Sequence, residues 1–244
     1  EHDKGHIPGA LWVDIDAARK LASRPGGLDD RSAWDAWIAP LGIGPDTEVL
    51  AYDASRQLEA ARLWWLLGYL GVPKVGLIDG GFPLWEKQGR PVTKEVPRVE
   101  PRSFPVTFRT ERHAPRAEVL AAIRGKTAKV IDARSDAEFT GAKVQSKRGG
   151  HIPGACHIEW AKLVDEEGRF LETETLRKTL DQLGIKPGTP VITHCQGGGR
   201  ASVDAFVMER LGYPTRNYYL GWADWGNVED TPITRGDGTD TPGK

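Results

Sequence analysis

One cysteine of this chain is followed by a glutamine, three consecutive glycines and an arginine. The run reads Cys195, Gln196, Gly197, Gly198, Gly199, Arg200. Glycines allow backbone turns with positive φ, so that successive N–H groups can converge on one point. A negative charge is stable at such a point, and the thiolate is the form of cysteine that acts as a nucleophile. The spacing therefore indicates a catalytic Cys195 with the following loop as its cradle.

The alternative is that Cys195 is an ordinary buried cysteine, because free cysteine is among the most buried residue types. Three adjacent glycines weigh against this reading. Each glycine costs conformational entropy on folding, and a purely structural turn rarely needs more than one. His194 precedes the cysteine, but adjacent side chains of a strand point to opposite faces, so we expect no direct Cys-His pair.

A strand and a helix are expected to position the cysteine. Val191 and Ile192 suit a buried strand that ends at Cys195. After the glycines, apolar residues recur at roughly helical spacing over 201–211. The positive end of the helix dipole would then lie at the loop and add to the stabilisation of a thiolate. This order places Cys195 at the carboxyl end of a strand, where α/β proteins usually carry their sites.

The chain also contains an internal repeat. The hexapeptide Gly-His-Ile-Pro-Gly-Ala occurs at 5–10 and again at 150–155. The correspondence continues at 45–53 against 187–195 and at 81–85 against 221–225. Self-similarity over this length indicates two tandem copies of one fold. At the position of Cys195 the first copy has Asp53, which has no thiol.

Each copy alternates predicted strands with predicted helices. In the second copy we expect helices at 117–123, 174–183 and 201–211, and strands at 129–132, 157–158, around 191 and at 217–220. In the first copy we expect strands at 49–52 and 75–78 and a helix at 60–70. The alternation predicts an α/β fold class: two tandem domains, each a mostly parallel sheet flanked by helices.

We expect the first domain at 1–92, a proline-rich linker at 93–115 and the second domain at 116–244. The tail from Thr231 is dense in Gly, Asp, Thr and Pro, which predicts an ill-ordered end. The first copy has few residues before its hexapeptide, so we expect that domain to be truncated at its N-terminus.

Composition limits the classes of partner. Lys and Arg number 33 against 34 Asp and Glu, for a formal net charge of −1, which provides no basic field for nucleic acid or an anionic membrane. No apolar stretch reaches the length of a membrane span. The 2 cysteines are too few for a disulfide framework. This favours a reducing compartment, and we expect a cytoplasmic location.

These features resemble the tandem-domain rhodanese family, which includes thiosulfate and 3-mercaptopyruvate sulfurtransferases. The resemblance covers nearly the whole chain and rests on the two His-Ile-Pro-Gly-Ala segments, 79–82 with Trp85, 221–222 with Trp225, and the six-residue loop 195–200. It implies that Cys195 takes sulfane sulfur from a small-molecule donor as a persulfide and passes it to cyanide or a thiol. It implies no metal or organic cofactor. With Asp53 at the cysteine position, only the second domain is expected to be active.

The loop departs from both named subtypes. Thiosulfate-type loops commonly place basic residues directly after the cysteine, and mercaptopyruvate-type loops place Gly and then Ser or Thr, whereas this loop has a single cation, Arg200. Where both types have a substrate-binding arginine, this chain has Glu138, which we expect to pair with Arg200. The expected donor-binding residues are Gln196, Gly197, Gly198, Gly199, Arg200, Arg134 and Glu138. We favour thiosulfate as the donor, with 3-mercaptopyruvate as the alternative.

Two other functions remain as alternatives. A cysteine phosphatase of the cell-cycle dual-specificity type shares this fold, but its arginine stands six positions after the cysteine, where this chain has Ala201. The smaller loop suits a sulfur atom better than a phosphate.

The second alternative is a regulatory or sulfur-delivery module with a protein acceptor, in which the first domain would be a docking surface. Retention of Cys195 and its loop weighs against an inert module, but not against a protein acceptor.

Overall fold

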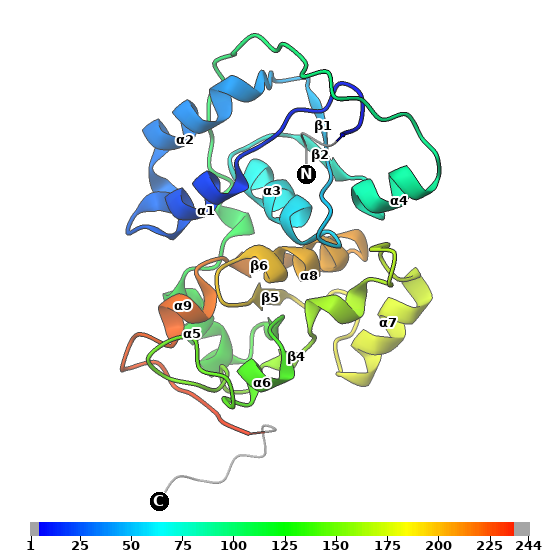
Figure 1. The fold of residues 1–244 in the computed structure, drawn as a ribbon. Coiled ribbons are helices and arrows are strands. Elements are labelled where there is room, and N and C mark those ends of the chain that lie inside the picture. Colours follow the sequence, from blue (N-terminus) through cyan, green and yellow to red (C-terminus); the bar gives the residue numbers. More distant parts are fainter. Residues whose placement is uncertain (1–4, 237–244) are drawn as a thin grey trace, which may run out of the picture. The chain divides into compact units, whose positions relative to one another are not determined.

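The structure is a computed structural model, and it describes residues 5–236. The chain divides into two compact units, Glu1–Arg109 with Glu166–Arg169, and Thr110–Asp165 with Phe170–Lys244. The division along the chain thus falls inside the segment 93–115 that the sequence predicts as a linker. Figure 1 shows that each unit combines strands with surrounding helices, so the predicted α/β class is confirmed.

The first unit has a short parallel sheet of two strands, β1 (Glu48–Ala51) and β2 (Lys74–Leu77). Its α-helices are α1 (Ile15–Ser23), α2 (Arg31–Ile38), α3 (Leu58–Tyr69) and α4 (Gly81–Lys87), with 3₁₀ turns η2 (Gly27–Asp29) and η3 (Ala39–Leu41). Helix α3 is buried over most of its surface, including Trp65 and Leu66. A helix that is apolar on nearly all sides forms the centre of a core rather than its cover.

The second unit has a parallel sheet in the order β4-β3-β5-β6. The strands are β3 (Lys129–Asp132), β4 (Cys156–His157), β5 (Val191–His194) and β6 (Thr215–Tyr218). The helices are α5 (Arg116–Gly125), α6 (Asp136–Phe139), α7 (Thr173–Gln182), α8 (Gly199–Arg210) and α9 (Gly221–Trp225), with 3₁₀ turns η4 (Thr110–Arg112) and η5 (Trp160–Leu163). Strand β5 lies between β3 and β6 and is buried along its whole length, as its apolar sequence predicts.

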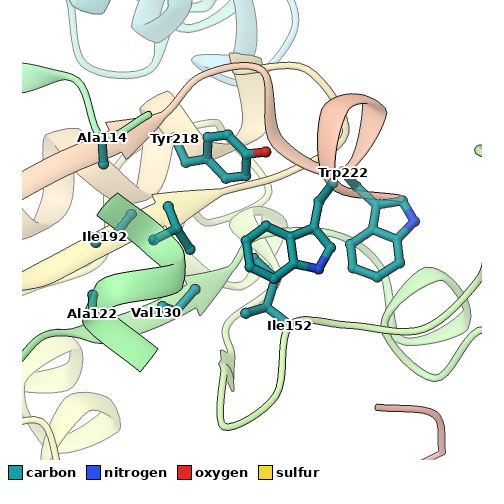
Figure 2. Close-up of a cluster of buried hydrophobic side chains, with 9 residues drawn as sticks. Ala114, Ala122, Val130, Ile152, Ile192, Tyr218 and Trp222 are labelled. Atoms are coloured by element: carbon teal, nitrogen blue, oxygen red, sulfur yellow. The ribbon is translucent and has the colours of Figure 1, made fainter. Parts of the chain in front are cut away.

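One face of this sheet carries an apolar core. Its buried members come from α5, the strands, α9 and two connecting segments: Ala114, Val119, Ala122, Val130, Ile152, Ile192, Tyr218, Trp222 and Trp225. Figure 2 shows the indole of Trp222 next to Ile152, with Val130 and Ile192 in the same cluster. Ile152 belongs to the second copy of the repeated hexapeptide, so that motif helps to form the core beneath the sheet.

The predicted ill-ordered tail is wrong for residues 231–236, and residues 237–244 lie outside the described part of the chain. Thr231 is only 3% exposed. Thr234 exchanges two backbone hydrogen bonds with His151, at N–O distances of 2.8 and 3.0 Å. Arg148 donates to the carbonyl oxygen of Thr231 at 3.0 Å. Residues 231–236 are therefore held by these polar contacts and by Ile233, which packs against the apolar core.

The predicted linker is also more than a surface connection. Val106 is fully buried, and the N–H of Thr107 donates to the carbonyl of Leu70 at 3.0 Å. Alternating apolar residues in this segment therefore pack into the first unit.

Within residues 5–236, none of the helices combines the length and apolar character that crossing a bilayer requires.

A buried ion pair joins Asp132 at the end of β3 to Arg134. The Nη2 of Arg134 lies 2.6 Å from Oδ2 of Asp132, its Nε lies 2.9 Å from Oδ1, and its Nη2 also donates to the carbonyl of Gly150 at 2.7 Å. The guanidinium stacks over the Trp222 ring at 4.3 Å from the centroid. Burial alone would raise the pKa of Asp132, but the electrostatic interaction with His194 together with the hydrogen bonds and charge of Arg134 outweighs this and holds that pKa below its usual value.

We predict that Arg134→Ala lowers the free energy of unfolding at pH 7 by about 3–5 kcal/mol, because it removes the cation that pairs with the buried Asp132 carboxylate and leaves only the backbone N–H of residue 134 as a donor. Since the folded pKa of Asp132 is lowered, the parent protein keeps this stabilisation above about pH 4 and loses it below. The unpaired carboxyl of the variant can take up a proton on acidification. The deficit should therefore shrink between pH 7 and pH ~4.5 in urea unfolding curves.

Lys162→Ala provides the control for this measurement. Lys162 lies 3.7 Å from Asp136, and both side chains are largely exposed. An exposed pair of this kind contributes about 0.5 kcal/mol or less. If Arg134→Ala costs no more than Lys162→Ala, or if its deficit is independent of pH, the ion pair does not have the role assigned to it.

Candidate active site

Cys195 lies directly after β5, at the carboxyl end of the central strand, as the sequence predicts. Its side chain is 2% exposed and packs with Ala133, Ala201 and the partly buried Trp160. Helix α8 starts four residues later at Gly199. The sulfur therefore sits close to the amino-terminal end of a helix of 12 residues, where partial positive charge collects.

Gly198 is the one position of the loop where the backbone requires glycine. It has φ 83°, in the left-handed region. A Cβ at this position would also lie 2.4 Å from atoms of the Tyr219 ring. A side chain at residue 198 would thus be excluded twice, by conformation and by space.

Helix α9 anchors the loop from the other side. The carbonyl of Cys195 accepts from the N–H of Trp222 at 2.7 Å, and the carbonyl of Gln196 accepts from the N–H of Ala223 at 2.9 Å. A Cβ at Gly221 would stand 2.2 Å from the Cys195 carbonyl oxygen, so only glycine allows this approach. The repeated Gly-aromatic segment at 221–222 is therefore part of the machinery that fixes the loop.

Arg200, in the first turn of α8, forms a two-pronged ion pair with Glu138 of α6. The Nη1 to Oε2 distance is 2.6 Å and the Nη2 to Oε1 distance is 2.9 Å. Burial would raise the pKa of Glu138, but its hydrogen bonds and charge interaction with Arg200 outweigh this and lower the pKa to about 2. The cation of the loop is therefore already matched by a carboxylate at every pH above about 4.

The same carboxylate is held by its own helix. Ser135 and Glu138 form a capping box, in which the N–H of Ser135 donates to Oε2 of Glu138 at 3.3 Å. The Ser135 hydroxyl donates to the same oxygen at 2.9 Å. These bonds within α6 hold the Glu138 carboxylate in the orientation in which it contacts Arg200. The spacing of Ser135 and Glu138 is visible in the sequence, whereas the identity of the third partner, Arg200, comes from a segment far along the chain.

Two residues that the sequence reading did not single out also contact this group. Gln145 Nε2 donates to Oε1 of Glu138 at 2.9 Å. Gln196 Nε2 donates to the hydroxyl of Ser146 at 3.1 Å, and Ser146 in turn donates to the carbonyl of Trp222 at 3.1 Å. Neither residue carries a motif, so no signal in the sequence identifies them.

Arg134 is not part of the group around Cys195. Its hydrogen bonds go to Asp132 and to the carbonyl of Gly150, and its side chain is 2% exposed. Binding a donor through Arg134 would require this buried pair to open. The geometry therefore gives no support to the donor-binding role expected for this residue.

His194 faces away from the sulfur, toward Asp132. Its Nε2 lies 3.5 Å from Oδ2 of Asp132, and its side chain has no exposure. Burial lowers the pKa of His194 to about 4, so that the imidazole is neutral at pH 7. Among residues 5–236, no group of three or more His, Cys, Asp or Glu side chains is arranged to hold a metal ion.

The equivalent loop of the first unit holds an anion. The two oxygens of Asp53 accept five hydrogen bonds, from the N–H groups of Ser55 (3.0 Å), Gln57 (3.0 Å), Glu59 (2.7 Å) and Ala60 (2.9 Å) and from the Ser55 hydroxyl (2.8 Å). The surrounding backbone repeats that of Cys195. The carbonyl of Asp53 accepts from the N–H of Phe82 at 2.8 Å, and a Cβ at Gly81 would meet that carbonyl oxygen at 2.4 Å.

A cavity of about 550 Å³ lies in the first unit beside β1 and reaches Asp53. Side chains of apolar residues such as Leu50, Leu63 and Leu67 contribute to its walls. Because the Asp53 oxygens are already bound to backbone N–H groups, we assign no chemistry to this cavity.

Comparisons with known proteins agree with this geometry. The model of the rhodanese-like domain matches residues 1–88 and 116–227. A thiosulfate sulfurtransferase of Pseudomonas aeruginosa is 33% identical over 232 residues, which cover 94% of this chain and 86% of that protein. The 3-mercaptopyruvate sulfurtransferase of Escherichia coli K12 is 31% identical over 238 residues, covering 96% and 84%.

A sulfur carrier protein of Thermus thermophilus, TtuD, is 34% identical over 264 residues and covers 97% of this chain and 87% of that protein. Among solved structures, wild-type EanB shares the fold, with a TM-score of 0.84 at 24% identity. The match covers 96% of this chain but only 60% of the EanB chain. The chain therefore belongs to the rhodanese family, as a tandem rhodanese-like protein related to thiosulfate and 3-mercaptopyruvate sulfurtransferases.

Proposed function

We propose that this protein transfers sulfane sulfur from thiosulfate to a thiophilic acceptor, cyanide or a thiol, through a persulfide on Cys195. The observation that carries the proposal is the first unit's Asp53, whose carboxylate accepts four backbone N–H groups at the position equivalent to Cys195. The same strand-loop-helix turn in the second unit offers the sulfur a similar environment for negative charge. A thiolate and a persulfide are both anions of that kind.

The reaction consists of two displacements. The Cys195 thiolate attacks the outer sulfur of thiosulfate, a new S–S bond forms, and the bond to the sulfonate sulfur breaks, so that sulfite leaves with the electron pair. Cyanide or a thiolate then attacks the outer sulfur of the persulfide, which releases thiocyanate or a new persulfide and restores the Cys195 thiolate. Charge is conserved in each step, and neither needs a redox partner.

The loop residues divide this work. The backbone N–H groups of the loop around Gly197 and Gly198 stabilise the sulfur anion, because preorganised donors need no rearrangement as charge moves. The N–H of Gly199 donates to the carbonyl of Gly197 at 3.2 Å. Arg200 is already bound by Glu138, so its main contribution is to brace the loop. Cys195 is only 2% exposed, which favours a compact donor such as thiosulfate. A 3-mercaptopyruvate donor remains the alternative, since relatives of about equal identity carry both names.

The arginine pair also bears on the phosphatase alternative. A phosphate held by an arginine takes both guanidinium N–H groups in a two-pronged contact. In this protein the same two nitrogens of Arg200 are occupied by Glu138, at 2.6 and 2.9 Å. This favours sulfur transfer over phosphate-ester hydrolysis. A protein acceptor is a second candidate, favoured by the 34% identity to TtuD, whose name is sulfur carrier protein.

We predict that Cys195→Ser abolishes thiocyanate formation from thiosulfate and cyanide, a loss of at least about a thousandfold, because a hydroxyl cannot form the persulfide. Cys156→Ser is the matched control. Cys156 is the other cysteine of the chain, is partly buried, and should be dispensable for the reaction. Equal circular dichroism spectra would show that both variants fold. Transfer at the parent rate by Cys195→Ser would contradict the mechanism.

The donor is tested by comparing kcat/KM for thiosulfate and 3-mercaptopyruvate with the same protein and acceptor. We expect the larger value for thiosulfate, and single-turnover loading should leave one sulfane sulfur on Cys195 that mass spectrometry detects. A larger kcat/KM for 3-mercaptopyruvate would assign the protein to the other donor while keeping the persulfide. Absence of loading by either donor would reject sulfur transfer itself.

We also predict that Glu138→Gln and Arg200→Gln each lower kcat/KM for thiosulfate by about tenfold, and that the double variant is no worse than either single one. Residues that act as a unit show this non-additivity. Lys162→Gln, an exposed residue of the same unit, is the control. If the two losses instead multiply, Arg200 acts on the donor independently of Glu138, and its assignment as a brace is wrong.

A further inference from the structure

Helix α8 carries a buried acid that the sulfur chemistry does not use. Asp204 has no exposed surface. Neither of its carboxyl oxygens has a hydrogen-bond partner within the described residues. A buried carboxylate without a partner is costly, because it loses the hydration of the charged form and gains nothing in return. Such a group demands an explanation.

Asp204 lies on the side of α8 that faces Cys195. Residues 200, 201 and 204 are three and four positions apart, so they share one face of the helix. Ala201 packs directly with Cys195 in one apolar cluster. The Asp204 carboxyl interacts electrostatically with Cys195, Asp132 and Arg200. The acid is therefore placed below the loop, within electrostatic reach of the sulfur.

A second buried aspartate of the same unit shows what Asp204 lacks. Asp132 has no exposure either, but Arg134 donates to both of its oxygens, and its pKa is lowered. For Asp204, burial raises the pKa well above its usual value, and the charges of Cys195 and Asp132 raise it further. Arg200 acts in the opposite direction. Because Arg200 is paired with Glu138, its charge lowers the pKa of Asp204 less than an unpaired arginine would.

Three elements pack against α8, namely the strands β5 and β6 and the 3₁₀ turn η5. Their titratable residues are His194 on β5, Arg216 and Tyr218 on β6, and Lys162 on η5. Each of these has another partner: His194 lies next to Asp132, Arg216 pairs with Glu118, Tyr218 donates to Asp224, and the exposed Lys162 lies 3.7 Å from Asp136. Among the described residues, no cation is bonded to Asp204 as Arg134 is to Asp132.

We propose that Asp204, which is buried without a hydrogen-bond partner among the described residues on the face of α8 that packs against Cys195, keeps a proton at neutral pH and so leaves the sulfur free to carry negative charge. Asp204 is a positioning residue in this scheme, since it acts through Cys195 and does not touch the donor. The inference deepens the proposed function, because it takes Cys195 to be an anion, but it does not depend on which sulfur donor is used.

Coupling between two sites is reciprocal. If the charge on Cys195 disfavours ionisation of Asp204, then an ionised Asp204 disfavours the thiolate and the persulfide to the same extent. The protonated acid is the state that lets the sulfur remain an anion. Above the pH at which Asp204 ionises, two like charges share one buried region, which sets an alkaline limit on the site.

The test is to follow the protonation of Asp204 directly. The protein is labelled with ¹³C at the aspartate carboxyl carbons, and the Asp204 resonance is assigned by its absence in Asp204→Asn. We expect this resonance to keep the chemical shift of a neutral acid through pH 7 in the parent protein. In Cys195→Ser, whose side chain is neutral at all pH values used, we expect the titration midpoint of Asp204 to fall by about one pH unit or more.

Two further samples complete the experiment. Parent protein alkylated at Cys195 with iodoacetamide carries a neutral adduct and should show the same fall, which covers the case that Cys195→Ser does not fold. The exposed Asp181, assigned with Asp181→Asn, is the control, and its resonance should show the same pH dependence in every sample.

An Asp204 resonance that titrates below pH 6 in the parent protein would overturn the proposal. So would a midpoint that is unchanged when Cys195 is made neutral. A failure of the proposed function is distinguishable, because it appears in the thiocyanate assay. A protein inactive in that assay whose Asp204 midpoint still responds to Cys195 would retain the coupling and lose only the assigned reaction.

Discussion

The structure depends on one constraint. Where a strand runs through a tight loop into a helix, the backbone N–H groups of the loop converge on a single point. Such a point must be filled by negative charge or by water. The first unit fills it with the carboxylate of Asp53, held by five hydrogen bonds. The second unit has Cys195 there, and the rest of its site follows from keeping this loop in place. The loop of the first unit is thus occupied by its own carboxylate, whereas the second unit has a cysteine at the equivalent position.

Fixation of the loop comes from three directions. Glycines at 198 and 221 allow close approach to the Tyr219 ring and to the Cys195 carbonyl. Helix α9 donates to two loop carbonyls. The pair of Arg200 and Glu138 ties the start of α8 to α6. Because α9 and α6 both hold the loop, its rigidity does not depend on its own glycines, which alone would not provide it.

Buried charge in the second unit is arranged in pairs, with one exception. Asp132 is bound by Arg134 and Glu138 by Arg200, and in both cases the pKa of the acid is lowered. Asp204 has no such partner. Paired acids stay ionised and hold structure together, whereas an unpaired acid next to a reactive anion responds to the state of that anion. In this unit the two acids with an arginine partner, Asp132 and Glu138, stabilise the fold, whereas Asp204 is the acid that we propose responds to Cys195.

The sequence by itself determined the α/β class, the tandem repeat, the position of Cys195 at the end of a buried strand and the loop that follows it. These features are local, since periodicity, glycine content and the repeat can be read within short windows. The expected pair of Glu138 with Arg200 came from a family resemblance, and the structure shows that contact. The ill-ordered end expected from Thr231 failed because Arg148 and His151, far away in the sequence, bind that segment.

Only the tertiary structure decided which polar groups meet. It directed Arg134 to Asp132 rather than to the loop, brought Gln145 and Ser146 to the site, and left Asp204 buried without a partner. The physical reason is the strand order. With β3 and β6 on either side of β5, residues far apart in the chain meet at one edge of the sheet. Whether a charged side chain at this edge finds a partner of opposite charge depends on the neighbouring strands and helices, and not on the residues next to it in the sequence.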